Sequence, residues 1–187
     1  TDDEAVRNLV SRIVHVESGG RSDAKNPLSS ALGPGQFIIS TWLHMIKTYH
    51  PELMQNLSRQ EVLDLRMDPA LSVEMVFNLT RQNRAYLVKN GFGVTSGRLY
   101  LAHFLGPEGA VRALGTDPDL SVEATLGSQV VDANPFLRGK SVADLIAWAE
   151  TKMTGKAPTQ AAISLPGSAA YTRDVDQILD TAGLTDG

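Results

Sequence analysis

Apolar side chains recur at helical spacing over residues 3–17. They occupy Ala5, Val6, Leu9, Val10, Ile13, Val14 and Val16. Apolar residues three and four positions apart line one face of a helix, whereas a half-buried strand alternates apolar with polar residues. Ser18-Gly19-Gly20 follows, and glycines of this kind end helices. The pattern therefore predicts an amphipathic helix that ends at Glu17, directly before a glycine break.

The next stretch, residues 21–36, is dense in Asn, Pro, Ser and Gly. This composition predicts a long irregular loop. Long loops inside compact domains are uncommon, and they are often functional. Phe37-Ile38-Ile39, which follows the loop, is the best strand-like fragment of the chain, but it is short.

The other periodic segments are predicted to be helical. Ser40 is expected to cap one short helix, and Ser58 with Glu61 has the spacing of a capping box for a second. A longer helix is expected to open at Asp68-Pro69 and to run to Asn90, where the next glycine supplies a left-handed stop. Further helices are predicted over residues 95–105, 108–114, 121–126 and 141–152. We therefore expect a mainly α fold with little or no β-sheet.

The composition changes at Gly155. Ala, Pro, Thr and Gln dominate there, Pro166-Gly167-Ser168 follows, and this is the composition of a linker. Tyr171–Leu179 is expected to form a short terminal helix. At roughly 100–200 residues per domain, the length indicates one domain with a tail. We predict a domain over residues 1–154, and a flexible linker with a short C-terminal helix over residues 155–187.

Charge and composition exclude several classes of protein. The chain has 187 residues, with 17 Lys and Arg against 21 Asp and Glu, so its formal net charge is −4. With this balance and no basic run, release of phosphate counterions contributes little, which argues against a nucleic-acid partner. No stretch of about 18 apolar residues is present to span a membrane. Thr1-Asp2-Asp3-Glu4 does not resemble a signal peptide, so an exported protein would have its leader absent from this chain.

Metal and nucleophile chemistry also find little support. The chain lacks Cys, which removes disulfides, thiolate zinc sites and thiol catalysis. His15, His44, His50 and His103 show no zincin spacing, and no Gly-x-Ser-x-Gly elbow is present. We predict no metal and no cofactor.

Glu17 is the strongest candidate for a reactive group. It closes an apolar helix before the glycine break, where the negative end of the helix dipole disfavours a carboxylate. Partial burial against apolar neighbours would act in the same direction. A glutamate that holds its proton near neutral pH is what a general acid requires. The alternative is an exposed glutamate at a frayed helix end.

Three ordered motifs resemble the soluble lytic transglycosylases, a family of lysozyme-like enzymes that cleave peptidoglycan. The family places Glu-Ser at a helix end, then a serine-bearing loop, a Gly-x-x-Gln turn and an Ala-Tyr-Asn-Ala-Gly segment. The matching segments of this chain are Glu17-Ser18-Gly19-Gly20, residues 24–37 with Gly33-Pro34-Gly35-Gln36, and residues 100–110. Asn134-Pro135-Phe136 and the helix of residues 141–152 resemble the end of the family's domain. The resemblance covers residues 4–153.

The resemblance implies a goose-type, lysozyme-like helical domain with a groove for the glycan strand. It implies cleavage of the β-1,4 bond between N-acetylmuramic acid and N-acetylglucosamine without addition of water. By analogy, Glu17 protonates the leaving oxygen and then takes the proton of the muramoyl 6-hydroxyl, which closes a 1,6-anhydro ring. A second carboxylate is not required, unlike in the usual two-carboxylate scheme.

Other site residues follow from the same resemblance. Ser29 or Ser30 matches the loop serine that contacts substrate. Gln36 would hydrogen-bond sugar or hold the loop, and Phe37 would contact the glycan or belong to the core. His103 and Phe104 stand where the family has Tyr-Asn, so His103, or Tyr100 one turn earlier, would replace the tyrosine that supports the acid. Asn83, mid-helix among polar residues, is expected to face the cleft.

Two alternatives remain open at this point. A hydrolytic lysozyme on the same fold would need a second acid, for which Asp23 is the candidate. An inactive glycan-binding assembly module would not need an intact Glu17. The resemblance further implies a periplasmic or cell-envelope protein whose partner is the peptidoglycan glycan strand. The tail after Gly155 matches none of the family's motifs. As a separate hypothesis, it tethers the protein to a secretion, flagellar or division assembly.

Overall fold

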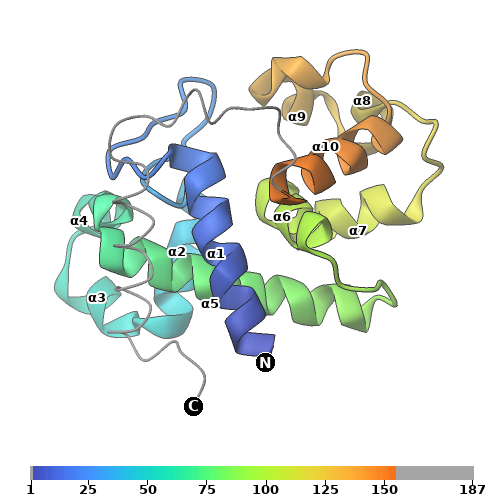
Figure 1. Cartoon of the computed structure of the whole chain (residues 1–187). Helices are drawn as coiled ribbons and strands as arrows, with labels where there is room; N and C mark the ends of the chain where they lie inside the picture. The colour runs from blue at the N-terminus through green and yellow to red at the C-terminus, as the bar shows by residue number, and fades with distance from the viewer. Residues whose placement is uncertain (1, 155–187) are drawn as a thin grey trace. The chain divides into compact units, whose positions relative to one another are not determined.

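Helices account for most of the chain that the computed structural model describes, residues 2–154 (Figure 1). Within these residues, β-structure is limited to isolated bridges, which pair Lys25 with Leu32, Leu32 with Phe37, and Ser121 with Ser141. The predicted mainly α fold is confirmed. The predicted linker and the helix Tyr171–Leu179 lie outside the described residues.

The chain divides into two units, and the boundary lies inside helix α5 (Pro69–Lys89), between Leu79 and Thr80. The first unit contains α1 (Asp2–Ser18), α2 (Ile39–Tyr49), α3 (Pro51–Asn56), α4 (Arg59–Asp64) and the 3-10 helix η1 (Leu65–Met67). The second contains α6 (Ser96–Leu105), α7 (Pro107–Gly115), α8 (Val122–Leu126), α9 (Ser128–Ala133), the 3-10 helix η2 (Pro135–Leu137) and α10 (Val142–Thr154). The sequence predicts one domain over residues 1–154 and gives no sign of this division.

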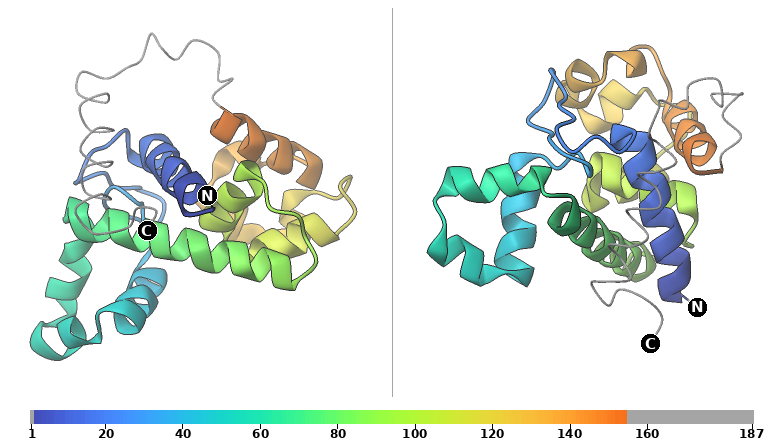
Figure 2. Two further views of the ribbon diagram at one scale, coloured as in Figure 1. Left: turned by 60° about the horizontal axis from the view of Figure 1, so that its bottom comes forward. Right: turned by 60° about the vertical axis from the view of Figure 1, so that its left-hand side comes forward.

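The core of the first unit is built from apolar faces of α1, α2 and α5. Fully buried side chains include Val10, Ile13, Val14, Trp42, Met45, Ile46, Val73 and Val76. α2, α3 and α4 pack against one another (Figure 2). The indole N–H of Trp42 donates to the carbonyl oxygen of Val62 at 2.7 Å, so α2 is joined to α4 through the core.

The start of α2 differs from the prediction. Ser40 does not cap it, because the helix begins at Ile39 and its N-cap, Ile38, makes no side-chain hydrogen bond. The hydroxyl oxygen of Ser30 instead accepts the N–H of Ile39 at 3.1 Å. A cap supplied from a distant loop leaves no local signal in the sequence. The short strand-like fragment Phe37–Ile39 forms no strand: only Phe37 forms a bridge, and Ile39 is helical.

Several helix ends are as predicted. The capping box of α4 is present: Glu61 N–H donates to Ser58 Oγ at 3.1 Å, and Ser58 N–H donates to Glu61 Oε1 at 3.0 Å. Asp68 Oδ1 accepts the N–H of Leu71 at 3.0 Å at the start of α5. Gly91 follows α5 with a φ of +84°, the left-handed conformation that glycine adopts readily. The short helices α3 and α9 are not predicted by the sequence.

In the second unit, α6 lies along α10 and against α7 (Figure 1). Gly97 leaves room for the carboxyl group of Glu150 between α6 and α10, because a Cβ at this position would overlap it. The hydroxyl of Thr95 donates to Glu150 Oε1 at 2.7 Å across the same contact. Leu101, Leu145 and Ala149 are buried there.

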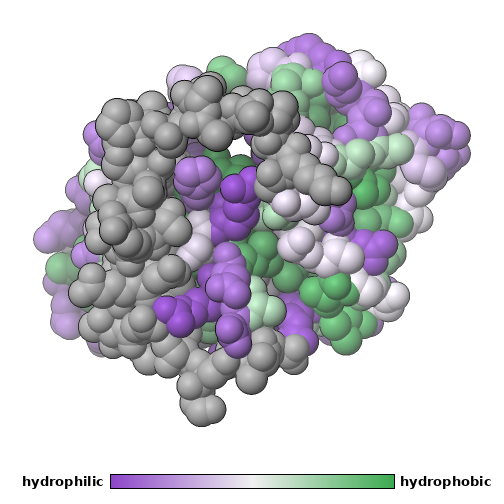
Figure 3. Space-filling model, in the orientation of Figure 1, coloured by the Kyte–Doolittle hydropathy of each residue, from purple (hydrophilic) through white to green (hydrophobic). Residues whose placement is uncertain are grey.

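Hydrophilic and hydrophobic residues are interspersed on the face seen in Figure 3. Among residues 2–154, no helix is both long enough and apolar enough to cross a bilayer.

Candidate functional site

Glu17 lies in the last turn of α1 and is half-buried. The next residue fixes the helix end: Ser18 Oγ donates to the carbonyl oxygen of Val14 at 2.9 Å and accepts the N–H of Gly20 at 3.0 Å. Gly19 and Gly20 then take left-handed φ values of 58° and 90°. The chain therefore turns away directly after Ser18, one residue beyond the predicted helix end.

The carboxylate of Glu17 is available to a ligand. Within residues 2–154 it accepts no hydrogen bond and forms no ion pair. A carboxyl group without an internal partner can donate or accept a proton without first breaking a protein contact. Asp23, the candidate second acid, is exposed in the loop.

Gln36 holds the loop together. Its side-chain Nε2 donates to the carbonyl oxygens of Ala24 and Gly33, each at 2.9 Å. Its backbone φ of 51° lies in the left-handed region, which is uncommon for a residue with a side chain. Of the two roles predicted for Gln36, the loop-holding role is the one its amide nitrogen performs.

Both loop serines use their hydroxyl oxygens as acceptors. Ser29 Oγ accepts the N–H of Ala31 at 3.2 Å, and Ser30 Oγ accepts the N–H of Ile39 at 3.1 Å. A hydroxyl that accepts one hydrogen bond still carries its own hydrogen to donate. Ser30 is exposed and Ser29 is half-buried, so Ser30 presents more of its side chain to solvent.

Arg66 holds the loop through hydrogen bonds to its backbone, and the sequence does not indicate this role. Arg66 is 6% exposed. Its Nη1 donates to the carbonyl oxygen of Ser30 at 2.6 Å and to that of Phe37 at 3.1 Å. Its Nε donates to the carbonyl oxygen of Leu63 at 2.8 Å. Burial lowers the pKa of this guanidinium from its usual value. Because Arg66 lies far along the chain from the loop, no local pattern could reveal this role.

Ser72 of α5 adds a second support that the sequence did not indicate. Its hydroxyl oxygen accepts the N–H of Gly35 at 3.3 Å, and Ser72 is fully buried. Gly35 lies so close to Val76 that a Cβ would come within 2.6 Å of the valine side chain. The Gly-x-x-Gln turn is therefore packed directly on α5.

Phe37 belongs to the core. It is 2% exposed, and its ring centroid lies 5.1 Å from that of Trp42. Of the two roles predicted for Phe37, packing is the one its position supports, because almost none of the ring is open to a sugar.

Asn83 of α5, in the second unit, is fully buried, and neither Nδ2 nor Oδ1 has a hydrogen-bond partner among the described residues. Buried amides without partners are rare in folded proteins and cost about 1–3 kcal/mol each. A polar side chain retained at this cost is a candidate for binding water or a ligand. The expectation that Asn83 faces the cleft stays a prediction.

Tyr100, His103 and Phe104 lie on α6 in the second unit. Tyr100 is 3% exposed, and its ring lies 6.3 Å from Phe104 and 5.6 Å from Trp148, measured between centroids. His103 and Phe104 are half-buried. Tyr100 and Phe104 are therefore parts of an aromatic cluster, and the predicted support of Glu17 by His103 or Tyr100 stays a prediction.

Within the described part of the chain, no group of three or more His, Asp or Glu side chains is arranged to hold a metal ion. A scan of the sequence against models of known protein families gives no match. The resemblance to the lytic transglycosylases therefore depends on the sequence motifs alone.

Proposed function

We propose that this protein is a peptidoglycan lytic transglycosylase that uses Glu17 as its acid and base. The observation that carries the proposal is the position of Glu17: a half-buried carboxyl group without an internal partner, at a fixed helix end. The motifs around it, from Ser18 to Gln36, supply the resemblance to the family.

Glu17 performs both proton transfers. In the first step it donates its proton to the oxygen between N-acetylmuramic acid and N-acetylglucosamine, and the bond to the anomeric carbon breaks. The neighbouring N-acetyl group of the substrate stabilises the cationic carbon. In the second step the Glu17 carboxylate takes the proton of the 6-hydroxyl, whose oxygen closes on the anomeric carbon as a 1,6-anhydro ring. No water enters the product, and Glu17 is returned to its protonated form.

The loop of residues 21–36 positions the substrate. Its backbone is fixed by Gln36, Arg66 and Ser72, so little conformational entropy is lost when a sugar binds. The Ser29 and Ser30 hydroxyls and the Gln36 carbonyl oxygen are polar groups that this fixed loop offers to sugar hydroxyls. The protein acts where its substrate lies, in the periplasm or cell envelope.

Replacement of Glu17 tests the proposal. Glu17→Gln keeps the size of the side chain and removes the transferable proton, so we expect lysis of purified peptidoglycan to fall at least about 10³-fold while the helical circular dichroism is unchanged. Glu123→Gln, at an exposed position of α8, is the matched control and should retain full activity. Full activity in Glu17→Gln would refute the proposed role.

The products distinguish the reaction classes. Mass spectrometry of digested peptidoglycan should show 1,6-anhydro muropeptides. Products with reducing ends would indicate a hydrolytic lysozyme instead. Absence of any cleavage by the wild-type protein, with retained glycan binding, would indicate an inactive binding module.

A further inference from the structure

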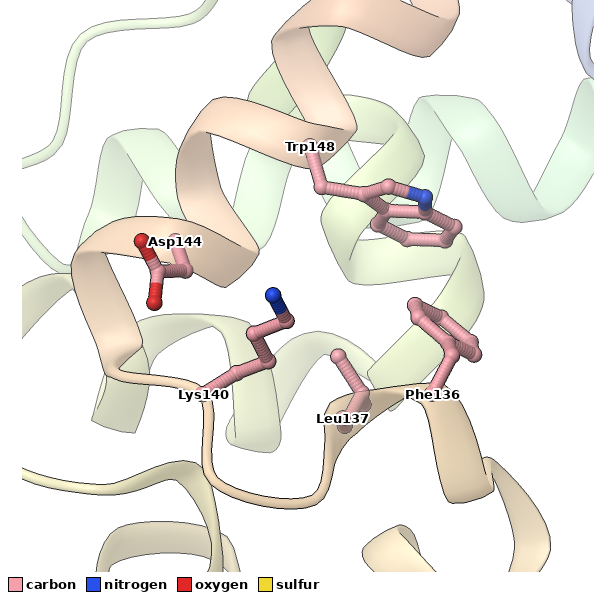
Figure 4. A pocket seen from close by; sticks show the side chains of 5 residues that line it. All are labelled: Phe136, Leu137, Lys140, Asp144 and Trp148. Atoms are coloured by element: carbon pink, nitrogen blue, oxygen red, sulfur yellow. The ribbon is translucent and has the colours of Figure 1, made fainter.

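A pocket of about 260 Å³ opens in the second unit. It is lined by Phe136, Leu137, Lys140, Asp144 and Trp148 (Figure 4). These residues come from η2, the turn after it and the first half of α10, so one short stretch of chain forms the site. None of these five residues has a role in the proposed reaction, although Phe136, Asp144 and Trp148 lie in segments that resemble the end of the family's domain.

Aromatic rings form one wall of the pocket. The Trp148 centroid lies 5.0 Å from that of Phe136 and 5.0 Å from that of Phe104. Through Tyr100, which is 3% exposed, this cluster continues into the core, whereas Phe136 at the other end is 48% exposed. The buried Tyr100 therefore holds the aromatic wall in place, and Phe136 presents aromatic surface to solvent.

One cation and one anion complete the lining. The Lys140 ammonium extends into the space beside Asp144 (Figure 4) and forms no hydrogen bond or ion pair with any residue in the described range. Hydrogen bonds from Ser141 keep the pKa of Asp144 below its usual value, and the charge of Lys140 acts in the same direction. The pocket therefore offers a donor and an acceptor of opposite charge. The Lys152 ammonium lies near its aromatic wall, 5.8 Å from the centroid of the Trp148 ring.

We propose that this pocket binds one uncharged pyranose ring, which stacks its C–H face on Trp148 and Phe136 and hydrogen-bonds Lys140 and Asp144 through its hydroxyl or acetamido groups. It is a non-catalytic glycan site, separate in role from Glu17. We take this sugar to be N-acetylglucosamine, and that choice rests on the proposed function. The class of ligand rests on the pocket alone.

The dimensions and charges of the pocket favour this ligand over others. Pockets for drug-sized ligands begin at about 300 Å³, so this one has room for a single ring. A carboxylate or an ammonium ligand would meet attraction from one charged side chain and repulsion from the other. A purely apolar ring would take Lys140 and Asp144 out of water without replacing their hydrogen bonds. A sugar ring has an apolar face and hydroxyl groups that both donate and accept.

Tryptophan fluorescence can report binding to this pocket. Of the two tryptophans, Trp42 is fully buried in the first unit and Trp148 lines the pocket. We would titrate the full chain carrying Glu17→Gln, so that the sugar stays intact, with N,N′,N″-triacetylchitotriose. A saturable change in emission is expected. Phe136→Ala should weaken binding at least tenfold, whereas Leu120→Ala, at an equally exposed apolar position of the same unit, should not.

Lys140→Met should also weaken binding, and Lys89→Met, at an exposed position of α5, should have no effect. The proposal is overturned if emission does not change, if Phe136→Ala binds as tightly as the parent, or if a short peptide competes better than the sugar. Peptidoglycan lysis measured on proteins with native Glu17 separates the two proposals. Sugar binding without any lysis would refute the proposed transglycosylase activity and support the sugar site. Lysis without a Phe136-dependent change in emission would support the activity and refute the sugar site.

Discussion

The side-chain amide of Gln36 donates a hydrogen bond to the carbonyl oxygen of Ala24 at 2.9 Å. Because Ala24 lies near the start of the loop and Gln36 at its end, this bond closes the loop on itself. The same Nε2 also reaches the carbonyl of Gly33, so one amide group satisfies two backbone acceptors. The motif glutamine is thereby a part of the structure that holds the loop beyond Glu17.

Gln36→Glu should destabilise the protein by about 2 kcal/mol. The carboxylate cannot donate, so the carbonyl oxygens of Ala24 and Gly33 would lose their hydrogen bonds and face a negative charge. Urea unfolding followed by circular dichroism measures the effect. Gln55→Glu, at an exposed position of α3, should change stability by less than about 0.5 kcal/mol. Equal effects of the two substitutions would contradict the role given to Gln36.

Gly33 and Gly91 form a natural pair for a second test. Both have left-handed φ values, +85° and +84°, but a Cβ on Gly33 would overlap the carbonyl oxygen of Arg66, whereas a Cβ on Gly91 would meet nothing within 4 Å. Gly91→Ala should cost about 1–2 kcal/mol from backbone strain alone. Gly33→Ala should cost about 1–3 kcal/mol more, because the backbone of Arg66 must shift. Thermal unfolding of both variants gives the difference, and a difference near zero would exclude close packing of the turn on η1.

Asn83→Leu should stabilise the protein by about 1 kcal/mol and reduce peptidoglycan lysis. Leucine branches at Cγ as asparagine does, and the substitution removes two buried polar atoms that lack partners. Thr125→Val is the matched control, because Thr125 Oγ1 is also buried without a partner. It should stabilise the protein and leave lysis unchanged. If Asn83→Leu instead destabilises the protein, the amide has a partner in solution that holds the fold together.

His50 makes the stability of the first unit depend on pH. Its Nε2 lies 2.6 Å from Glu74 Oε2, and its Nδ1 lies 3.2 Å from Glu52 Oε1. Burial alone would lower the pKa of His50, but the hydrogen bonds and charges of Glu74 and Glu52 raise it above the usual 6.5. The folded state therefore binds this proton more tightly than the unfolded state does.

The contribution of His50 to stability is thus complete below about pH 6.5 and is lost as the pH rises through the higher folded-state pKa. Urea unfolding at several pH values from about 6 to 9 should show this loss in the wild-type protein and a flatter profile in His50→Gln. If the stability of the wild-type protein and that of His50→Gln change in parallel over this pH range, the ion pairs of His50 with Glu74 and Glu52 do not contribute to the pH dependence. Lys47→Gln, on the exposed side of α2, serves as the comparison.

Local chemistry made much of the fold predictable. The apolar spacing before Glu17, the capping box at Ser58 and Glu61, and the proline after Asp68 each act within about one turn of helix, where sequence and structure are directly coupled. Short helices such as α3 and α9 lack enough turns to show a period, and they escaped prediction for that reason.

The candidate site was predictable only in part. The sequence indicates Glu17 at a helix end because the glycine break follows directly. It does not indicate that Arg66 and Ser72 support the loop, nor that Ser30 caps α2, because each of these bonds joins residues that are distant along the chain. It also left two roles open for both Gln36 and Phe37, which their contacts and burial distinguish.

By itself, the amino-acid sequence determined a mainly helical chain, the helix end at Glu17 and the loop that follows, because propensity, capping and periodicity act between near neighbours. The tertiary structure decided which side chains hold that loop and which aromatic residues are buried. It also decided that Asn83 is buried without a partner. These properties depend on packing between distant segments, which no short stretch of sequence encodes.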